Sequence, residues 1–125
     1  MVFIDKETND LSYKIIGCAY NVHKELGPGL LESAYETCLC YELSKIEINY
    51  EKQKGLPIIY KDATLDCGYR IDILVENKIV IELKTVEKLL PIHTAQIMTY
   101  LKLSNKHLGL LFNFYNANLQ NGIKR

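Results

Sequence analysis

Two carboxylates and a lysine, Asp72, Glu82 and Lys84, are the residues of this sequence best placed to do chemistry. The residues around them alternate between apolar and polar, which is typical of two strands joined by a short turn. When the apolar faces are aligned, Asp72 falls opposite Glu82, and Lys84 points the same way as Glu82. Facing carboxylates repel each other, whereas a divalent cation would bind both. The alternative is a solvated face on which Arg70 and Lys84 neutralise the two acids.

The pairing of these strands is predicted from six aliphatic residues that they would bury together. A three-residue turn at 76–78 lets residue 75 pair with 79, 73 with 81, and 71 with 83. A slip of one residue would turn half of these side chains to the wrong face. The six residues are Ile71, Ile73, Val75, Ile79, Ile81 and Leu83.

Three further polar residues lie on helices that the pattern predicts beside these strands. Glu32 falls in the first turn of a helix, where a glutamate is also a common partner of the helix dipole. Gln96 and Tyr100 are four residues apart, and so lie on one face of a later helix that is apolar almost all round. A buried glutamine amide needs hydrogen-bond partners, so this pair belongs either to a site or to the core.

The helices that would position these residues follow from periodicity and from Gly and Pro. Apolar residues at helical spacing predict a first helix capped by Asn9 or Asp10 and ended by the Gly-Pro-Gly segment at 27–29. A second helix follows at once, and Pro91 opens a third that runs to about residue 103.

The strands follow from runs of period two and from one apolar run near the end. The order α, α, β, β, β, β, α, β predicts an α/β or α+β fold in which helices cover a small mixed sheet. The expected strands are residues 48–52, 57–60, 64–75, 79–84 and 107–115.

Length and composition limit the class of protein. The 125 residues, without repeat or linker, predict a single domain spanning 1–125, and the 48% hydrophobic content is that of a globular protein. Fifteen basic and fifteen acidic residues give a net charge of zero, which excludes a strongly basic protein that coats nucleic acid. A net charge of zero is still compatible with an enzyme that contacts a few phosphates. Apolar runs fall short of the ~18 residues of a membrane span, so a cytoplasmic location is expected.

The cysteines do not have the spacing of a zinc site. Without a CxxC pair, they are predicted to be four small buried hydrophobic residues in a reducing compartment. They are Cys18, Cys38, Cys40 and Cys67.

Taken together, these motifs resemble the PD-(D/E)XK nuclease superfamily. Asp72 followed by Glu82-Leu83-Lys84 is similar to its signature strand pair, and residues 96–100, QIMTY, resemble the Q-x-x-x-Y helix motif of its exonuclease-like branch. Residues 29–35, GLLESAY, resemble the motif that names the bacterial and archaeal GxxExxY proteins, a branch of that superfamily. The similarity runs from about residue 8 to the C-terminus. The joint occurrence of the motifs, in this order, carries the resemblance.

The resemblance implies a restriction-endonuclease-like αβββαβ core with a metal site at the mouth of the sheet. Asp72 and Glu82 would hold Mg²⁺ or Mn²⁺, with the backbone carbonyl of Leu83 as a further ligand. Glu32 would reach the same cluster from its helix, directly or through a water.

The resemblance also implies catalytic roles. Lys84 would position the water nucleophile and stabilise charge on the phosphate, while Gln96 and Tyr100 would brace the site. By alternation Arg70 shares the face of Asp72, so it is a candidate substrate contact.

The expected function is therefore a metal-dependent nuclease that hydrolyses nucleic-acid phosphodiester bonds with a metal-activated water. The alternative is a nuclease-like domain that binds nucleic acid or a protein partner without turnover. A purely structural protein would leave the facing carboxylates unexplained. Because the net charge is zero, a local basic patch or a partner, including a second copy in a homodimer, must supply phosphate binding. Candidate patch residues are Lys52, Lys54, Lys61, Arg70, Lys84 and Lys88.

Overall fold

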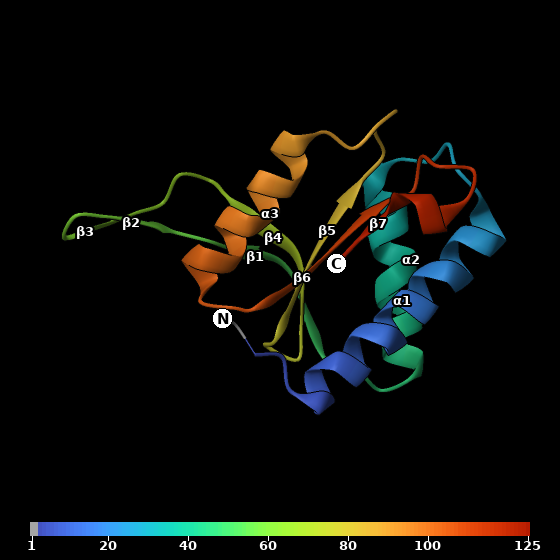
Figure 1. Cartoon of the computed structure of the whole chain (residues 1–125), viewed down its shortest axis with the longest axis horizontal. Coiled ribbons are helices and arrows are strands. Elements are labelled where there is room, and N and C mark those ends of the chain that lie inside the picture. The colour runs from blue at the N-terminus through green and yellow to red at the C-terminus, as the bar shows by residue number, and fades with distance from the viewer. Residues whose placement is uncertain (1–2) are drawn as a thin grey trace.

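The computed structural model describes residues 3–125, which form three layers with a mixed sheet in the middle (Figure 1). Helices α1 (Lys6–Leu26) and α2 (Glu32–Lys45) cover one face of the sheet, and α3 (Pro91–Ser104) covers the other. The predicted mixed α/β class with a restriction-endonuclease-like core is confirmed. Among the described residues, every helix is too short or too polar to cross a membrane.

The sheet brings the ends of three strands to one edge. Neighbouring strands in the sheet are antiparallel except β5 and β6. These two are parallel, because α3 connects the end of β5 to the start of β6 at the other end of the sheet. The end of β5, the end of β6 and the start of β4 therefore meet at the same edge. In spatial order the strands are β1 (Tyr50–Gly55), β4 (Arg70–Val75), β5 (Ile79–Lys84), β6 (Leu108–Asn113) and β7 (Ile123–Lys124).

The register of β4 and β5 confirms most of the predicted pairing. Val75 pairs with Ile79 and Ile73 with Ile81, as the aliphatic pattern requires. These side chains are fully buried in the core beneath α1 and α2. A one-residue slip would have exposed them, so burial fixes the register.

Beyond Ile73 the two strands part, and the predicted pairing of 71 with 83 is wrong. The carboxylate of Asp72 accepts a hydrogen bond from the backbone N–H of Leu83, at 2.9 Å between Oδ2 and N. The Asp72 side chain thus accepts a hydrogen bond at the position where the next backbone hydrogen bond between the two strands would form. Ile71 turns away from Ile73 and packs in the second core, beneath α3.

Helix α1 begins earlier than the sequence indicates. Asp5 caps it, accepting a hydrogen bond from the Thr8 backbone N–H at 2.7 Å, so the prediction of Asn9 or Asp10 as the cap is wrong. The helix ends as predicted at Gly27, whose φ of 67° favours glycine.

The predicted strand over 64–75 is also wrong, because the chain bends at 66–69. Gly68 has a φ of 79°, and its N–H donates to the carboxylate of Asp66. The bend separates β4 from a two-stranded hairpin of β2 (Ile58–Tyr60) and β3 (Ala63–Leu65), which we call the arm. The arm projects from the body on the side of α3 (Figure 1).

The bend also corrects the prediction for one cysteine. Cys18 and Cys40 are buried and Cys38 is partly buried, as expected. Cys67 is exposed because it lies in the 66–69 bend, where no layer covers it within the described residues.

The last segment was not predicted as regular structure. A short 3₁₀ helix, η1 (Leu119–Gly122), leads into β7, which pairs antiparallel with the end of β6. A Cβ at Gly122 would collide with the backbone oxygen of Asn113, so only glycine fits there. This segment closes the sheet beside β6.

Candidate active site

Asp72, Glu82 and Lys84 lie at the edge of the sheet where β4 begins and β5 ends. Glu82 and Lys84 lie on the face of β5 opposite Leu83, whose side chain packs in the core beneath α1 and α2, because side chains alternate along a strand. Asp72 lies beside Glu82, at the point where the alternation of β4 is interrupted between Ile71 and Ile73. The predicted convergence of the three residues follows from this register.

Glu82 is a buried carboxylate with little to neutralise it. It is 4% exposed, and its Oε2 lies 3.7 Å from the Nζ of Lys84. Its other oxygen, Oε1, is buried without a hydrogen-bond partner among residues 3–125. Burial, followed by the neighbouring carboxyl of Asp72, raises the pKa of Glu82 to about 9. A buried oxygen without a partner requires an explanation, and a bound cation would provide one.

Asp72 is held in place from two sides. Its Oδ2 accepts from the Leu83 N–H, and its Oδ1 accepts from Nε2 of Gln53 at 3.3 Å. The same Gln53 amide donates to the carboxylate of Glu36 at 2.9 Å. Gln53 and Glu36 were missed in the sequence, because the pairing of β1 with β4 brings Gln53 to Asp72 and the packing of α2 brings Glu36 to Gln53.

Gln53 also has an unusual backbone. Its φ of 50° is in the left-handed region, which a glutamine adopts at some cost. Its neighbours Lys52 and Lys54 pair with Ile73 and Ile71, so Gln53 falls opposite Asp72 across the two strands. The distortion occurs at the position that supports the candidate ligand.

Glu32 approaches from the first residue of α2. Burial raises its pKa most, while Lys84 lowers it and Asp72 raises it, so its carboxyl lies within the electrostatic reach of both. Tyr35, one turn later, fixes the preceding loop, since its hydroxyl donates to the Gly27 carbonyl at 2.6 Å and accepts from the Leu30 N–H at 3.1 Å. The motif at 29–35 therefore has one residue facing the site and one anchoring the loop.

Gln96 and Tyr100 lie on α3, and they face each other. The Nε2 of Gln96 donates to the Tyr100 hydroxyl at 3.1 Å. Tyr100 is buried, and burial raises its pKa most, with further contributions from the charges of Glu82 and Asp72. The helix thus brings Tyr100 within the electrostatic reach of both carboxylates.

Of the predicted basic patch residues, Arg70 and Lys54 lie on the paired strands β4 and β1. Arg70 is exposed and pairs with Gly55 across β1 and β4. Lys54 is bound to Glu51 at 3.1 Å, which neutralises part of its charge. The contact of Arg70 with substrate stays a prediction.

The loop after Lys84 is bound to β6 through a residue that no sequence pattern singled out. Asn113, buried and paired with Lys84 in the sheet, accepts from the Val86 N–H at 3.1 Å and donates to the Val86 carbonyl at 2.8 Å. These two bonds fix the backbone directly beyond Lys84.

The donor set fits a divalent cation through two carboxylates. Within residues 3–125, no three His, Cys, Asp or Glu side chains converge as a ready ligand group. The unpartnered oxygen of Glu82 beside the like charge of Asp72 nevertheless fits a hard cation, which prefers carboxylate and carbonyl oxygens. Glu32 stands near the pair without completing a group of three.

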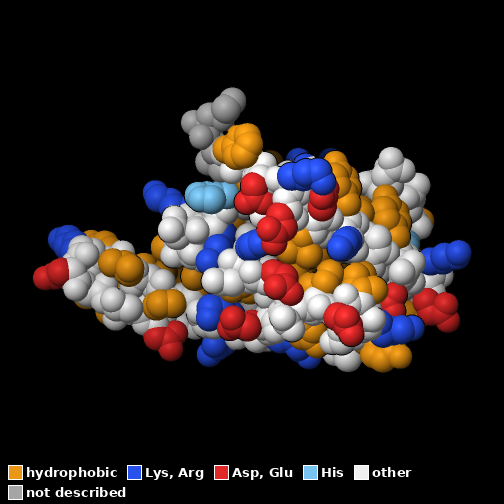
Figure 2. Space-filling model, turned by 90° about the horizontal axis from the view of Figure 1, so that it is seen from below, with side chains coloured by type: hydrophobic (Ala, Val, Ile, Leu, Met, Phe, Trp, Pro, Cys, Tyr) orange, Lys and Arg blue, Asp and Glu red, His pale blue; other side chains and the backbone are white. Residues whose placement is uncertain are grey.

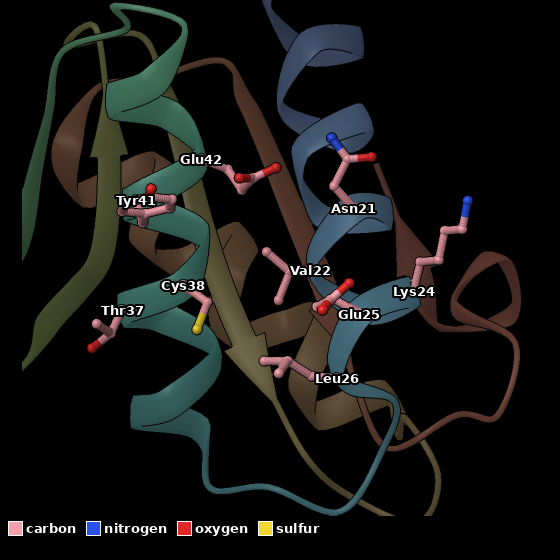
Figure 3. Close-up of a pocket in the computed structure, with 9 residues that line it drawn as sticks. All are labelled: Asn21, Val22, Lys24, Glu25, Leu26, Thr37, Cys38, Tyr41 and Glu42. Atoms are coloured by element: carbon pink, nitrogen blue, oxygen red, sulfur yellow. The ribbon is translucent and has the colours of Figure 1, made fainter.

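A groove lies between α1 and α2, and its lining does not include the candidate site residues (Figure 3). It has a volume of about 640 Å³, and Leu26, Cys38, Tyr41 and Glu42 are among its lining residues. Asp72, Glu82 and Lys84 do not line this groove, so it is separate from the candidate site.

Comparison with protein families gives one match that covers almost the whole chain. Residues 9–125 match the model of the PD-(D/E)XK nuclease superfamily. Curated proteins and solved structures gave no significant match. The match includes the acidic pair, the lysine, and the helices that carry Glu32, Gln96 and Tyr100. This chain belongs to the PD-(D/E)XK nuclease superfamily.

Proposed function

We propose that this protein is a metal-dependent nuclease that hydrolyses phosphodiester bonds of DNA or RNA. The observation that carries the proposal is the buried carboxylate of Glu82, whose Oε1 has no hydrogen-bond partner among residues 3–125 and which lies beside Asp72 and Lys84. A buried carboxylate without a partner destabilises the fold, and a bound cation would compensate for its charge. We also propose that the chain belongs to the GxxExxY branch, on the motif at 29–35.

The ligands would come from three positions on the paired strands. Asp72 and Glu82 would hold Mg²⁺ or Mn²⁺ with their carboxylates, the Leu83 carbonyl would be a further ligand, and Glu32 would join through a water. When bound, the cation supplies Lewis-acid polarisation of the phosphate and lowers the pKa of water.

The chain's own residues would do the rest of the chemistry. Lys84 would orient the attacking water and stabilise the charge that develops on the phosphate. The hydrogen-bonded pair of Gln96 and Tyr100 would hold that corner of the site in a fixed shape. Arg70 would contact a flanking phosphate.

Nucleic acid is the expected partner, although the charge distribution offers limited help. The net charge is zero, and the face seen in Figure 2 carries interspersed acidic and basic side chains. A homodimer would add binding surface that one copy lacks. A cytoplasmic location fits the four free cysteines.

A second candidate is a domain that binds nucleic acid or a protein without turnover. The observation that favours it is that no three acidic, His or Cys side chains within residues 3–125 converge as a ligand group. A binding domain should hold nucleic acid equally well when Asp72 is replaced by Asn.

Calorimetric titration with Mg²⁺ and Mn²⁺ tests the proposal. We expect the wild type to bind, Asp72→Ala to lose binding, and Asp66→Ala, an exposed aspartate in the bend, to bind like the wild type. Nucleic-acid cleavage assays on the same three proteins should follow the same order. Full cleavage by Asp72→Ala would overturn the site assignment. Binding of nucleic acid without metal and without cleavage would favour the second candidate.

A further inference from the structure

A small cavity lies between α3 and the base of the arm, directly beside the proposed active site. Its volume is about 220 Å³, below the roughly 300–1,000 Å³ of pockets for drug-sized ligands, so it suits a single ring system. Two of its residues, Gln96 and Tyr100, are the pair that faces the carboxylates. The lining consists of Ile58, Tyr69, Gln96, Thr99, Tyr100 and Leu103.

The cavity is built to receive a flat, uncharged group. Tyr69 is 45% exposed, and its ring is held edge-on against Tyr100, with 6.2 Å between the centroids and 62° between the planes. The cavity is therefore lined by one partly exposed aromatic ring held against a buried one. Ile58 and Leu103 add aliphatic walls, which favour an aromatic ligand over an ion.

Gln96 adds hydrogen-bonding capacity to this apolar wall. A glutamine amide has two N–H donors and one oxygen acceptor, and one donor is committed to the Tyr100 hydroxyl. The second N–H and the oxygen are the complementary pair that glutamine uses to bind the edge of a base.

The charge balance points to the same kind of ligand. With a net charge of zero, phosphate contacts alone give the protein weak attraction for nucleic acid. Stacking of bases on aromatic side chains supplies affinity that does not depend on net charge. In a duplex both faces of a base are covered by its neighbours, so only an unstacked base can enter the cavity.

We infer that this cavity binds one unstacked nucleobase of single-stranded nucleic acid, stacked on Tyr69, which places an adjoining phosphate at Asp72 and Glu82. The inference rests on the proposed nuclease function and narrows its substrate to single strands or frayed ends. The arm then serves as the wall that closes the cavity from the side opposite α3.

Binding measured without turnover tests this inference. In EDTA, fluorescence anisotropy would compare a labelled single strand, in DNA and RNA form, with the same strand carrying abasic sites and with its duplex. We expect the wild type to bind at least one intact single strand about tenfold more tightly than its abasic form. Tyr69→Leu should bring that ratio close to one, whereas Tyr69→Phe, which keeps the ring, should preserve it.

Two control variants exclude trivial explanations. Tyr41→Leu removes another exposed tyrosine, which is 64% exposed on α2 and lines the groove of Figure 3 and not the cavity beside Tyr69, and should leave the ratio unchanged. Thr99→Leu fills the cavity from α3 without removing Tyr69, and should lower the ratio. Circular dichroism of each variant verifies that it is folded.

The outcomes separate this inference from the nuclease proposal. Equal ratios in wild type and Tyr69→Leu overturn the base cavity even if metal-dependent cleavage occurs. A Tyr69-dependent ratio supports the cavity even if cleavage is absent, in which case only the nuclease proposal fails. Tighter binding to the duplex than to the single strand would also overturn the inference.

Discussion

The two faces of strand β5 differ in what they bury. Leu83 and Glu82 are neighbours and are almost equally inaccessible, at 1% and 4% exposure. Leu83 packs in the apolar core beneath α1 and α2, where burial stabilises the fold. Glu82 lies on the opposite face with an unpartnered oxygen among the described residues, where burial opposes ionisation. One strand therefore contributes stability on one side and proposed chemistry on the other.

The same contrast extends to the helices on each face. The core beneath α1 and α2 holds fully buried aromatic residues, including Tyr35 stacked on Phe114 with 4.4 Å between ring centroids. The α3 side has a smaller core and carries the arm and the cavity beside Tyr69. A large core on one face can compensate for unfavourable groups on the other, because stability is a sum over the whole domain.

The largest effect is expected at Lys84, on the polar face. Lys84→Ala should lower metal-dependent cleavage by about 10²–10³-fold, the usual cost of removing one electrostatic stabiliser of a transition state. Lys14→Ala, an exposed lysine on α1, serves as the control for loss of a positive charge and should cleave normally. Initial rates at saturating metal measure the difference. Wild-type rates for Lys84→Ala would remove this residue from the proposed mechanism.

The apolar face should respond in the opposite way. Ile81→Ala removes a fully buried side chain from the core beneath α1 and α2 and should lower the free energy of unfolding by about 2–5 kcal/mol. Urea denaturation followed by circular dichroism measures it. At temperatures where the variant is folded, its affinity for Mn²⁺ should match that of the wild type. If Ile81→Ala lost as much free energy of Mn²⁺ binding as free energy of unfolding, the apolar and polar faces of β5 would not act independently.

A smaller effect, with a distinct pH dependence, is expected at Glu82. In the metal-free folded protein Glu82 keeps its proton up to about pH 9, whereas the unfolded chain releases it near 4.5. The folded state therefore binds more protons between these values, and its stability falls as pH rises through that window. Glu82→Gln keeps the neutral shape and should be more stable than the wild type by about 1–4 kcal/mol at pH 8.

Thermal denaturation between pH 5 and 9 measures this difference. The gain of Glu82→Gln over the metal-free wild type should shrink toward pH 5, where both side chains are neutral. Added Mn²⁺ should raise the melting temperature of the wild type at pH 8 and leave that of Glu82→Gln unchanged, because the ligand binds the folded carboxylate. A constant difference across the pH range would contradict the assignment of the buried charge.

The sequence was sufficient where local patterns determine the structure. Alternation along β4 and β5 predicted the pairing of Val75 with Ile79 and Ile73 with Ile81, since burial of one face allows only one register. The same alternation predicted that Glu82 and Lys84 point the same way, and their charged atoms lie 3.7 Å apart. The spacing of Gln96 and Tyr100 likewise predicted that they share one face of α3, where they form a hydrogen bond.

The sequence was insufficient where long-range contacts decide. Gln53 reaches Asp72 only through the β1–β4 register, and Asn113 reaches Val86 only after β6 has crossed to lie beside β5. The separation of the strands at Ile71 depends on a hydrogen bond from the backbone of one strand to a side chain of the other. These contacts have no periodic signature, so composition and spacing could not predict them.

The smallest effect is expected at Glu32, which stands between the two faces at the start of α2. Glu32→Ala should weaken Mn²⁺ binding a few-fold, because its carboxyl lies within the electrostatic reach of Asp72 and Lys84 without completing a group of three ligands. Its loss at the helix N-terminus should cost at most about 1 kcal/mol of stability. Glu42→Ala, on the same helix and away from the carboxylates, controls for the change in net charge (Figure 3). The opposite result would be an unchanged metal affinity by calorimetry together with a melting temperature of Glu32→Ala well below that of Glu42→Ala. Glu32 would then stabilise the helix dipole, and the motif at 29–35 would contribute to stability and not to metal binding.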